Sequence, residues 1–227
     1  MSIKTKILAA AATLTLVGGL GVTGELAANA ATPSCGNHCI DIFSNEFGTH
    51  HSPNFVLDVL RQGARVGQPI ILYRTSNSDP AEDFTVSYQG TVADFYAAKL
   101  VSASLDLHYS HLYAFEFQYS PNGVNSGLCM GVGSTAANAT PVALEPCGAS
   151  AKTVWVVDSY NSITGHYVPL INGSDTNFSH PYVLHYPGNS YPTDSPRPQL
   201  NTYTLQQYSN GTVFNNEQWG ADYGILK

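Results

Sequence analysis

The chain has 227 residues with 16 acidic and 9 basic side chains, a formal net charge of −7, and only 11% of its residues are charged. Phosphate backbones and anionic lipid surfaces repel an acidic chain, so neither nucleic acid nor a membrane is an expected partner. Gly (20), Pro (13) and Tyr (14) are plentiful, which favours short strands and tight turns. No stretch carries Glu, Lys and Leu at the spacing of a long amphipathic helix. The composition therefore predicts an all-β protein, and the length is that of one domain.

The first 30 residues have the pattern of a secretory signal peptide. Two lysines precede an apolar, uncharged run over residues 7–22, and a small-x-small cleavage site ends at Ala30. A transmembrane anchor is the alternative, but these 16 residues would span only about 24 Å as a helix. The peptide carries two lysines and one glutamate, so its removal changes the net charge from −7 to −8. We expect a mature, secreted extracellular chain of residues 31–227.

Four cysteines, Cys35, Cys39, Cys129 and Cys147, allow three disulfide pairings. An exported chain favours disulfides over metal thiolates. Because Cys129 and Cys147 bracket a compact stretch, we expect them to pair, which leaves Cys35 with Cys39. The Cys129–Cys147 link would close a loop of about 19 residues and contribute on the order of 3 kcal/mol in the chain-entropy account.

Three segments of the chain repeat the order strand, turn, strand, loop, strand. Their apolar strand patterns lie at 55–59, 69–73 and 82–86, then at 128–132, 141–145 and 153–157, then at 182–186, 203–206 and 217–219. An aromatic residue closes each unit (Phe84, Trp155 and Trp219), and we expect the two tryptophans in the core. A further apolar strand precedes each unit, at 40–42, 113–117 and 167–171.

Four strands in each of three units predict twelve strands. One such unit cannot bury its apolar face alone, but three units packed around an axis can. The units cover approximately residues 40–90, 112–158 and 166–224, with residues 91–111 as an insertion between the first two. A β-sandwich whose short strands are periodic by accident is the alternative.

The second unit resembles a known family. Its residues 126–132 (SGLCMGV), 144–147 (LEPC) and Trp155 are similar to the repeat of ricin B-type lectins, which reads Cys-Leu-Asp-Val, then Leu-aromatic-x-Cys, then Gln-x-Trp. The resemblance covers roughly residues 40–224, and its distinctive part is the cysteine pair with the downstream Trp. It implies an all-β fold, a β-trefoil of three four-strand repeats with pseudo-threefold symmetry, and a carbohydrate-binding function.

The resemblance assigns a tentative sugar-binding site to the first unit. Asp58 takes the position of the family's Asp, Tyr73 that of the aromatic platform, and Glu82 that of the Gln. A carboxylate accepts charge-assisted hydrogen bonds from neighbouring hydroxyls, and a flat ring covers the C–H side of a sugar. Glu82 departs from the pattern because an ionised carboxylate cannot donate. Asp58 and Tyr73 also have a purely structural interpretation, since an Asp before a turn commonly binds backbone amides.

The other two units depart further from the lectin pattern. The second has Gly131 in place of the Asp and Glu145 in place of the aromatic platform. The third has His185 in place of the Asp, and Gln206 or Tyr208 is expected near the platform position. The resemblance therefore predicts at most one sugar site, in the first unit.

No sequence pattern indicates catalysis, a metal or a cofactor. The local pairs His50-His51 and His108/His111 lack a third ligand at zinc-like spacing. No Ser-nucleophile elbow, HExxH helix or phosphate loop is present. We therefore expect no catalytic residue, no bound metal and no cofactor.

The leading hypothesis is a secreted carbohydrate-binding protein that is not an enzyme. The alternative is a trefoil scaffold that binds or inhibits a protein partner, such as an extracellular protease, through the segments 93–111 and 187–201, because loops on rigid scaffolds carry recognition. A hydrolase is a third, weaker hypothesis.

Overall fold

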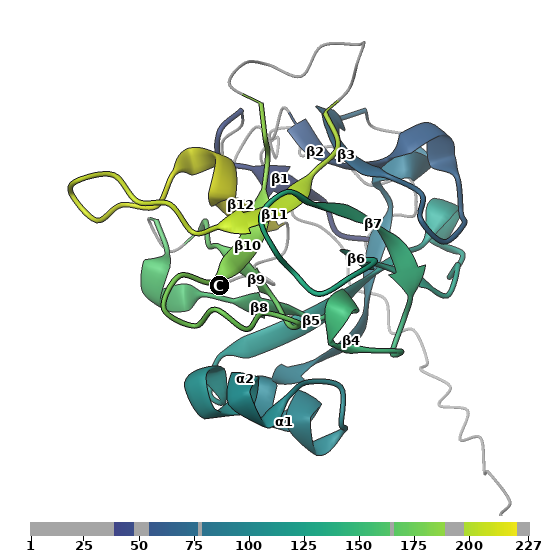
Figure 1. The fold of residues 1–227 in the computed structure, drawn as a ribbon. Helices are drawn as coiled ribbons and strands as arrows, with labels where there is room; N and C mark the ends of the chain where they lie inside the picture. The colour runs from purple at the N-terminus through teal and green to yellow at the C-terminus, as the bar shows by residue number, and fades with distance from the viewer. Residues whose placement is uncertain (1–38, 48–54, 77–78, 164–165, 189–197, 222–227) are drawn as a thin grey trace, which may run out of the picture.

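The computed structural model describes residues 39–47, 55–76, 79–163, 166–188 and 198–221 (Figure 1). The strands in these segments are β1 (Ile42–Ser44), β2 (Phe55–Val59), β3 (Ile70–Arg74), β4 (Phe84–Thr91), β5 (Tyr113–Tyr119), β6 (Leu128–Val132), β7 (Thr140–Pro146), β8 (Trp155–Val157), β9 (Leu170–Asn172), β10 (Tyr182–His185), β11 (Asn201–Thr204) and β12 (Trp219–Ala221). Two short helices are α1 (Val92–Ala97) and α2 (Ala103–Tyr109). The predicted all-β class is confirmed.

Six of the strands form a closed barrel. Antiparallel ladders join β1 to β12, β4 to β5, β5 to β8 and β8 to β9. The bridges Ile40–Phe84 and Val168–Trp219 connect the remaining neighbours, so the ring runs β1-β4-β5-β8-β9-β12. Closing a sheet on itself removes its exposed edges. Each unit contributes its first and last strand to this barrel.

The other six strands form three hairpins, β2–β3, β6–β7 and β10–β11. A ladder joins β7 to β11, and the bridges Pro69–Ala143 and Ile71–Gln199 join β3 to both of the other hairpins. Each hairpin therefore contacts the other two. The hairpins make a threefold cap on the barrel, as the repeated sequence pattern predicts.

Equivalent aromatic residues fill the core between barrel and cap. Phe84, Trp155 and Trp219 are fully buried. The indole N–H of Trp155 donates to the carbonyl of Met130 at 2.9 Å, and that of Trp219 donates to the carbonyl of Leu184 at 2.9 Å. Buried indoles usually find such a partner. The predicted core position of both tryptophans is confirmed.

Cys129 and Cys147 form the expected disulfide, with their Cα atoms 5.0 Å apart. Cys39 is also disulfide-bonded, and its expected partner, Cys35, lies outside the described residues, as does the expected signal peptide. Within the described part of the chain, no helix is long and apolar enough to cross a membrane.

The insertion between the first two units is helical, which the sequence patterns do not predict. Thr91 and Asp94 form a capping box that starts α1, and the Ser102 side chain accepts from the backbone N–H of Leu105 to start α2. Phe95 and Leu105 are fully buried in a second apolar cluster against the barrel. Helices of six and seven residues are too short to show a helical period, so only the caps could have indicated them.

Candidate functional site

The first hairpin places the predicted site residues on one face. Asp58 lies opposite Ile71 in the β2–β3 ladder, and directly opposite residues share a face of the sheet. Tyr73 lies two residues beyond Ile71, so it shares that face as well. Asp58 is buried and Tyr73 is half-buried. The hairpin therefore brings Asp58 and Tyr73 together on one face as expected, but the Asp58 side chain is buried away from solvent.

Glu82 binds the loop that precedes β4. Its carboxylate accepts from the backbone N–H of Ser76 at 2.9 Å and from the Thr75 hydroxyl at 3.0 Å. Asp58, Asp79 and Glu82 each place one carboxylate oxygen within 4.8 Å of the other two. Burial raises the pKa of Glu82 to about 8 against its hydrogen bonds, and nearby Asp79 adds to the rise. Glu82 is therefore largely protonated at neutral pH, where it helps to hold the loop.

The third unit repeats this arrangement with Glu217. Glu82 and Glu217 both end a 3-10 turn immediately before the last strand of their unit, η3 (Pro80–Glu82) and η7 (Asn215–Glu217). The Glu217 carboxylate accepts from the backbone N–H of Gln206 at 2.7 Å, and burial raises its pKa to about 8. Two acids at equivalent positions thus each bind a loop backbone. The same structural role accounts for Glu82 without a ligand.

The third hairpin gathers a set of polar residues that sequence reasoning passed over. His185 lies opposite Asn201, and Tyr203 lies two residues further along β11 on the same face. His185 Nδ1 is 2.9 Å from Asn201 Oδ1, and His185 Nε2 is 3.1 Å from Asn216 Nδ2. The ring of Tyr203 lies 5.1 Å from that of His185, tilted by 31°. Asn216 comes from η7, so three separate segments converge here.

One protonation state of His185 satisfies all of these contacts. With the proton on Nδ1, the ring donates to Asn201 Oδ1 while Nε2 accepts from Asn216 Nδ2. Asn216 Nδ2 also donates to the Tyr186 carbonyl at 3.1 Å. The imidazole is only 8% exposed, and this burial lowers its pKa. His185 is therefore neutral at neutral pH, and it fixes the orientation of both amides.

The second hairpin cannot form an equivalent site. Gly131 lies opposite Ala143, and a Cβ at Gly131 would come within 2.9 Å of both the Lys152 carbonyl and the Thr153 methyl. No side chain can enter this position without a backbone shift. Glu145 stands where the other hairpins have an aromatic ring.

The strand register corrects the expected platform of the third unit. Sequence comparison put Gln206 or Tyr208 near this position, but the register gives it to Tyr203. Tyr208 instead packs against Phe214 in the loop after β11, with ring centroids 4.3 Å apart and the rings tilted by 33°. The long β10–β11 connection hides the register, because its length sets no fixed offset between the strands. The pattern Asn-x-Tyr at 201–203 was the available signal.

No protein-family profile and no curated protein sequence matches the chain. The designed 3-fold symmetric protein ThreeFoil is similar in structure, with a TM-score of 0.52 and 14% identity over 82% of this chain and 98% of its own. The protein is a β-trefoil. The trefoil is also similar to 1,3Gal43A, an exo-β-1,3-galactanase from Clostridium thermocellum, with a TM-score of 0.52 and 12% identity over 82% of the trefoil. That match covers only 30% of the galactanase chain.

The ricin B-like lectin of Macrolepiota procera in complex with lactose matches with a TM-score of 0.47 and 16% identity over 82% of this chain and 95% of its own. Identities this low establish the fold alone. The likeness to ThreeFoil confirms the predicted β-trefoil architecture, while the residues of each hairpin decide what the trefoil can bind.

Proposed function

We propose that this trefoil is a secreted carbohydrate-binding protein and that its third hairpin holds the sugar site. The observation that carries this proposal is the hydrogen-bonded chain Asn201–His185–Asn216 beside the ring of Tyr203. The first hairpin is the weaker candidate because Asp58 and Glu82 are 2% and 4% exposed, and Glu82 is engaged with its own loop.

The chemistry of the third hairpin fits a neutral polyol. The Asn201 amide can both donate to and accept from a ligand, and the buried imidazole holds it in one orientation. Tyr203 is half-buried, so its ring can cover the C–H side of a sugar at little entropic cost. No ionised group among these four residues would repel or select a charged ligand. The arrangement supports binding rather than catalysis, since both ring nitrogens of His185 are already hydrogen-bonded to amides.

A single site of this kind binds weakly. A Kd near millimolar corresponds to about −4 kcal/mol, so useful binding requires several trefoils on one surface or a dense glycan. Retention on a polysaccharide matrix is therefore a better readout than binding of one free sugar.

The proposal is tested by affinity electrophoresis and a glycan array with Tyr203→Ala. Loss of the ring is expected to lower retention at least about tenfold, equivalent to about 1.4 kcal/mol. Tyr113→Ala is the matched control, because Tyr113 is a 60% exposed tyrosine on the barrel strand β5. Retention unchanged in Tyr203→Ala but lost in Asp58→Ala would return the site to the first hairpin.

Secretion is tested separately by the mass of the exported protein. Cleavage after Ala30 predicts a mature chain that starts at Ala31. An exported protein that still carries residues 1–30, or a protein found only inside the cell, would contradict this part of the proposal.

A further inference from the structure

A groove outside the three hairpin faces lies between two loops of the trefoil. One loop is η6 (Ser159–Asn161) with the two residues that follow it, and the other is the turn at 210–213 that projects from the yellow end of the ribbon in Figure 1. The groove has a volume of about 320 Å³. It is lined by Tyr160, Asn161, Ser162, Ile163, Asn210, Gly211, Thr212 and Val213.

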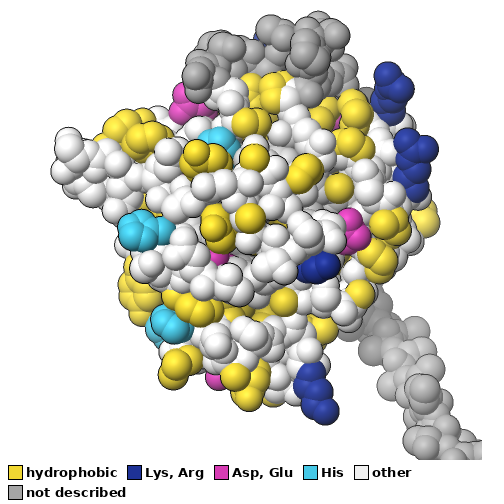
Figure 2. Space-filling view, viewed as in Figure 1, with side chains coloured by type: hydrophobic (Ala, Val, Ile, Leu, Met, Phe, Trp, Pro, Cys, Tyr) yellow, Lys and Arg dark blue, Asp and Glu magenta, His cyan; other side chains and the backbone are white. Residues whose placement is uncertain are grey.

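The lining of this groove indicates the class of ligand. All eight residues are uncharged, and four of them carry an amide or an aliphatic hydroxyl. The face of the molecule in Figure 2 is likewise mostly hydrophobic and uncharged polar. Phosphates and cations bind where opposite charge is available. A groove with amides, hydroxyls and one aromatic ring instead suits a neutral ligand with many hydroxyls.

Tyr160 is an exposed ring that is held in place. Its side chain is 72% exposed, yet its hydroxyl is hydrogen-bonded to His111 Nε2, and the two rings lie 5.6 Å apart at 61°. His111 follows α2, so the helical insertion supports this ring from the side. A ring that is already ordered loses little conformational entropy when a ligand stacks on it.

Asn161 also lines this groove and is held in place by hydrogen bonds. Its Nδ2 donates to Asp158 Oδ2 at 2.6 Å, and its Oδ1 accepts from Gln207 Nε2 at 3.3 Å. Its backbone carbonyl accepts from Gln218 Nε2 at 3.0 Å. Asp158 also accepts the backbone N–H groups of Tyr160 and Asn161, so its charge is engaged below the groove. One N–H and one lone pair of the Asn161 amide remain for a ligand.

We infer that this groove is a second carbohydrate-binding site, which takes one neutral sugar unit with Tyr160 as the stacking platform and Asn161 as the oriented amide. It lies on residues that the hairpin faces do not use, so a trefoil that binds through both surfaces is bivalent. The inference rests on the proposed function only for the class of ligand. It also gives the insertion a role, because His111 positions Tyr160.

The experiment is a ¹H–¹⁵N NMR titration of the mature chain, made in a host without N-glycosylation so that the Asn210-Gly-Thr acceptor stays unmodified. The probes are glucose, galactose, mannose, xylose and lactose, each at about 50 mM to populate a millimolar site. At least one sugar is expected to shift the amide signals of 160–163 and 210–213. These shifts should persist in Tyr203→Ala and disappear in Tyr160→Ala.

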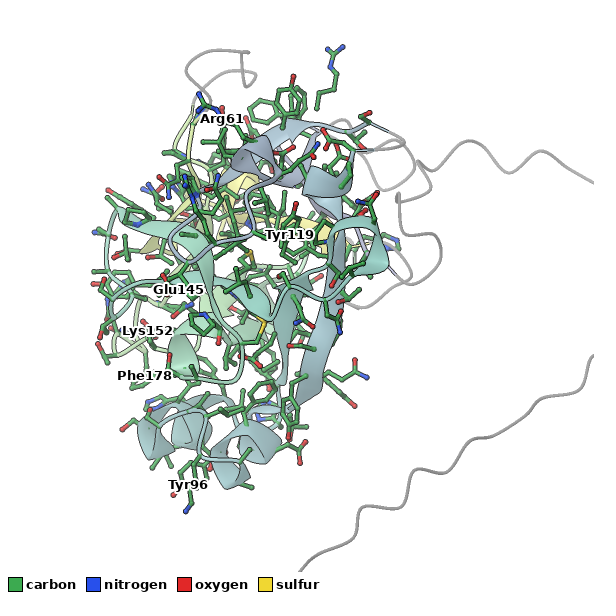
Figure 3. All side chains as sticks on the ribbon, turned by 90° about the vertical axis from the view of Figure 1, so that its right-hand side faces the viewer. Arg61, Tyr96, Tyr119, Glu145, Lys152 and Phe178 are labelled. Atoms are coloured by element: carbon green, nitrogen blue, oxygen red, sulfur yellow. A yellow bond between two sulfur atoms is a disulfide. The ribbon has the colours of Figure 1, made fainter. Side chains whose placement is uncertain are left out.

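Two further variants separate loss of the platform from loss of structure. Tyr160→Phe keeps the ring but loses the bond to His111, and His111→Ala leaves the ring unsupported, so both should weaken the groove shifts several-fold without abolishing them. Tyr96→Ala is the matched control, since Tyr96 is a 44% exposed tyrosine on α1, at the end of the molecule opposite Arg61 (Figure 3). It should leave the groove shifts unchanged.

The outcomes distinguish this inference from the proposed function. Shifts confined to the signals of His185, Asn201, Tyr203 and Asn216, and lost in Tyr203→Ala, would overturn the groove and leave the hairpin site in place. Shifts confined to the groove would support the groove and overturn the hairpin site. Absence of shifts with every probe would overturn both.

Discussion

The first and third β-hairpins have the same strand register but bring together different kinds of residue. In the first, Asp58, Asp79 and Glu82 place carboxylate oxygens within 4.8 Å of one another. In the third, His185 links two amides through hydrogen bonds of 2.9 and 3.1 Å. Both hairpins use an acid before the last strand to hold a loop. They differ in what stands at the position of Asp58 and His185.

Under the proposed function, this difference explains why the third hairpin and not the first receives the ligand. A carboxyl group withdrawn from water is costly to ionise, and in the first hairpin this burial raises the pKa of Glu82 to about 8. A neutral imidazole carries no such cost, and it orients the Asn201 amide, whose Nδ2 can donate to a ligand. The residue that best matches a family position in sequence is therefore in the less suitable environment.

The largest expected effect is on the pH dependence of stability. The pKa of Glu82 and of Glu217 is about 8 in the folded protein, above the ordinary 4.5. Between these values the folded state keeps protons that the unfolded state has released, so stability falls as pH rises from about 4.5 to 8. Each acid contributes a loss on the order of a few kcal/mol.

Glu82→Gln and Glu217→Gln test this expectation by urea unfolding between about pH 5 and 9. Each amide keeps the acceptor for the loop N–H and cannot ionise, so each variant should lose less stability at alkaline pH than the parent protein. The stability of the double variant should depend least on pH. An unchanged slope in both single variants would show that neither acid is neutral in the folded state.

The next largest effect is expected at His185. His185→Ala leaves a cavity and two amides without their partner, which should lower the free energy of unfolding by about 2–4 kcal/mol and remove the sugar-induced NMR shifts of Asn201, Tyr203 and Asn216. Burial lowers the pKa of His185 from the ordinary 6.5, so stability should also fall as pH drops below that value, because the unfolded chain protonates first. The alanine variant should lack this acid-side loss. Sugar-induced NMR shifts of Asn201, Tyr203 and Asn216 that survive His185→Ala would exclude the third hairpin as the site.

The trefoil itself was predictable from the sequence, and the reason is its periodicity. The alternating apolar residues of 55–59 and 128–132, and the aromatic residue closing each unit, depend only on which side chains must be buried. Cys129 and Cys147 could be paired because they bracket one hairpin. These patterns each involve residues that lie close together in the chain, so they can be recognised in a single sequence.

The location of the proposed site was not predictable in the same way. Asp58 occupies the right position along the chain, but it is buried, and Asp79 and Glu82 from the segment between β3 and β4 place carboxylate oxygens within 4.8 Å of its own. Tyr203 could not be aligned because the connection before it has no fixed length. Burial and register are tertiary properties, and the family pattern alone could not supply them.

A smaller effect is expected from Asp79→Asn, which acts on one hairpin only. Asp79 raises the pKa of Glu82 but does not contribute to that of Glu217. Its replacement keeps the acceptor for the Ala81 N–H and removes one nearby charge, so the alkaline loss of stability should shrink by less than about 1 kcal/mol. This gain in stability at alkaline pH should vanish in the Glu82→Gln background and persist in the Glu217→Gln background. A gain of equal size in both backgrounds would contradict the coupling.

The smallest expected effect is that of Tyr73→Ala on sugar binding. Tyr73 and Tyr203 occupy equivalent positions, two residues beyond the partner of Asp58 and of His185. Both are half-buried, so each truncation should cost a similar amount of stability, about 1–2 kcal/mol. Retention on a polysaccharide should nevertheless stay within about twofold in Tyr73→Ala while it falls at least about tenfold in Tyr203→Ala. Equal losses in the two variants would mean that the ring decides binding whatever lies beside it, and the contrast between an acidic and a neutral hairpin would then have no functional consequence.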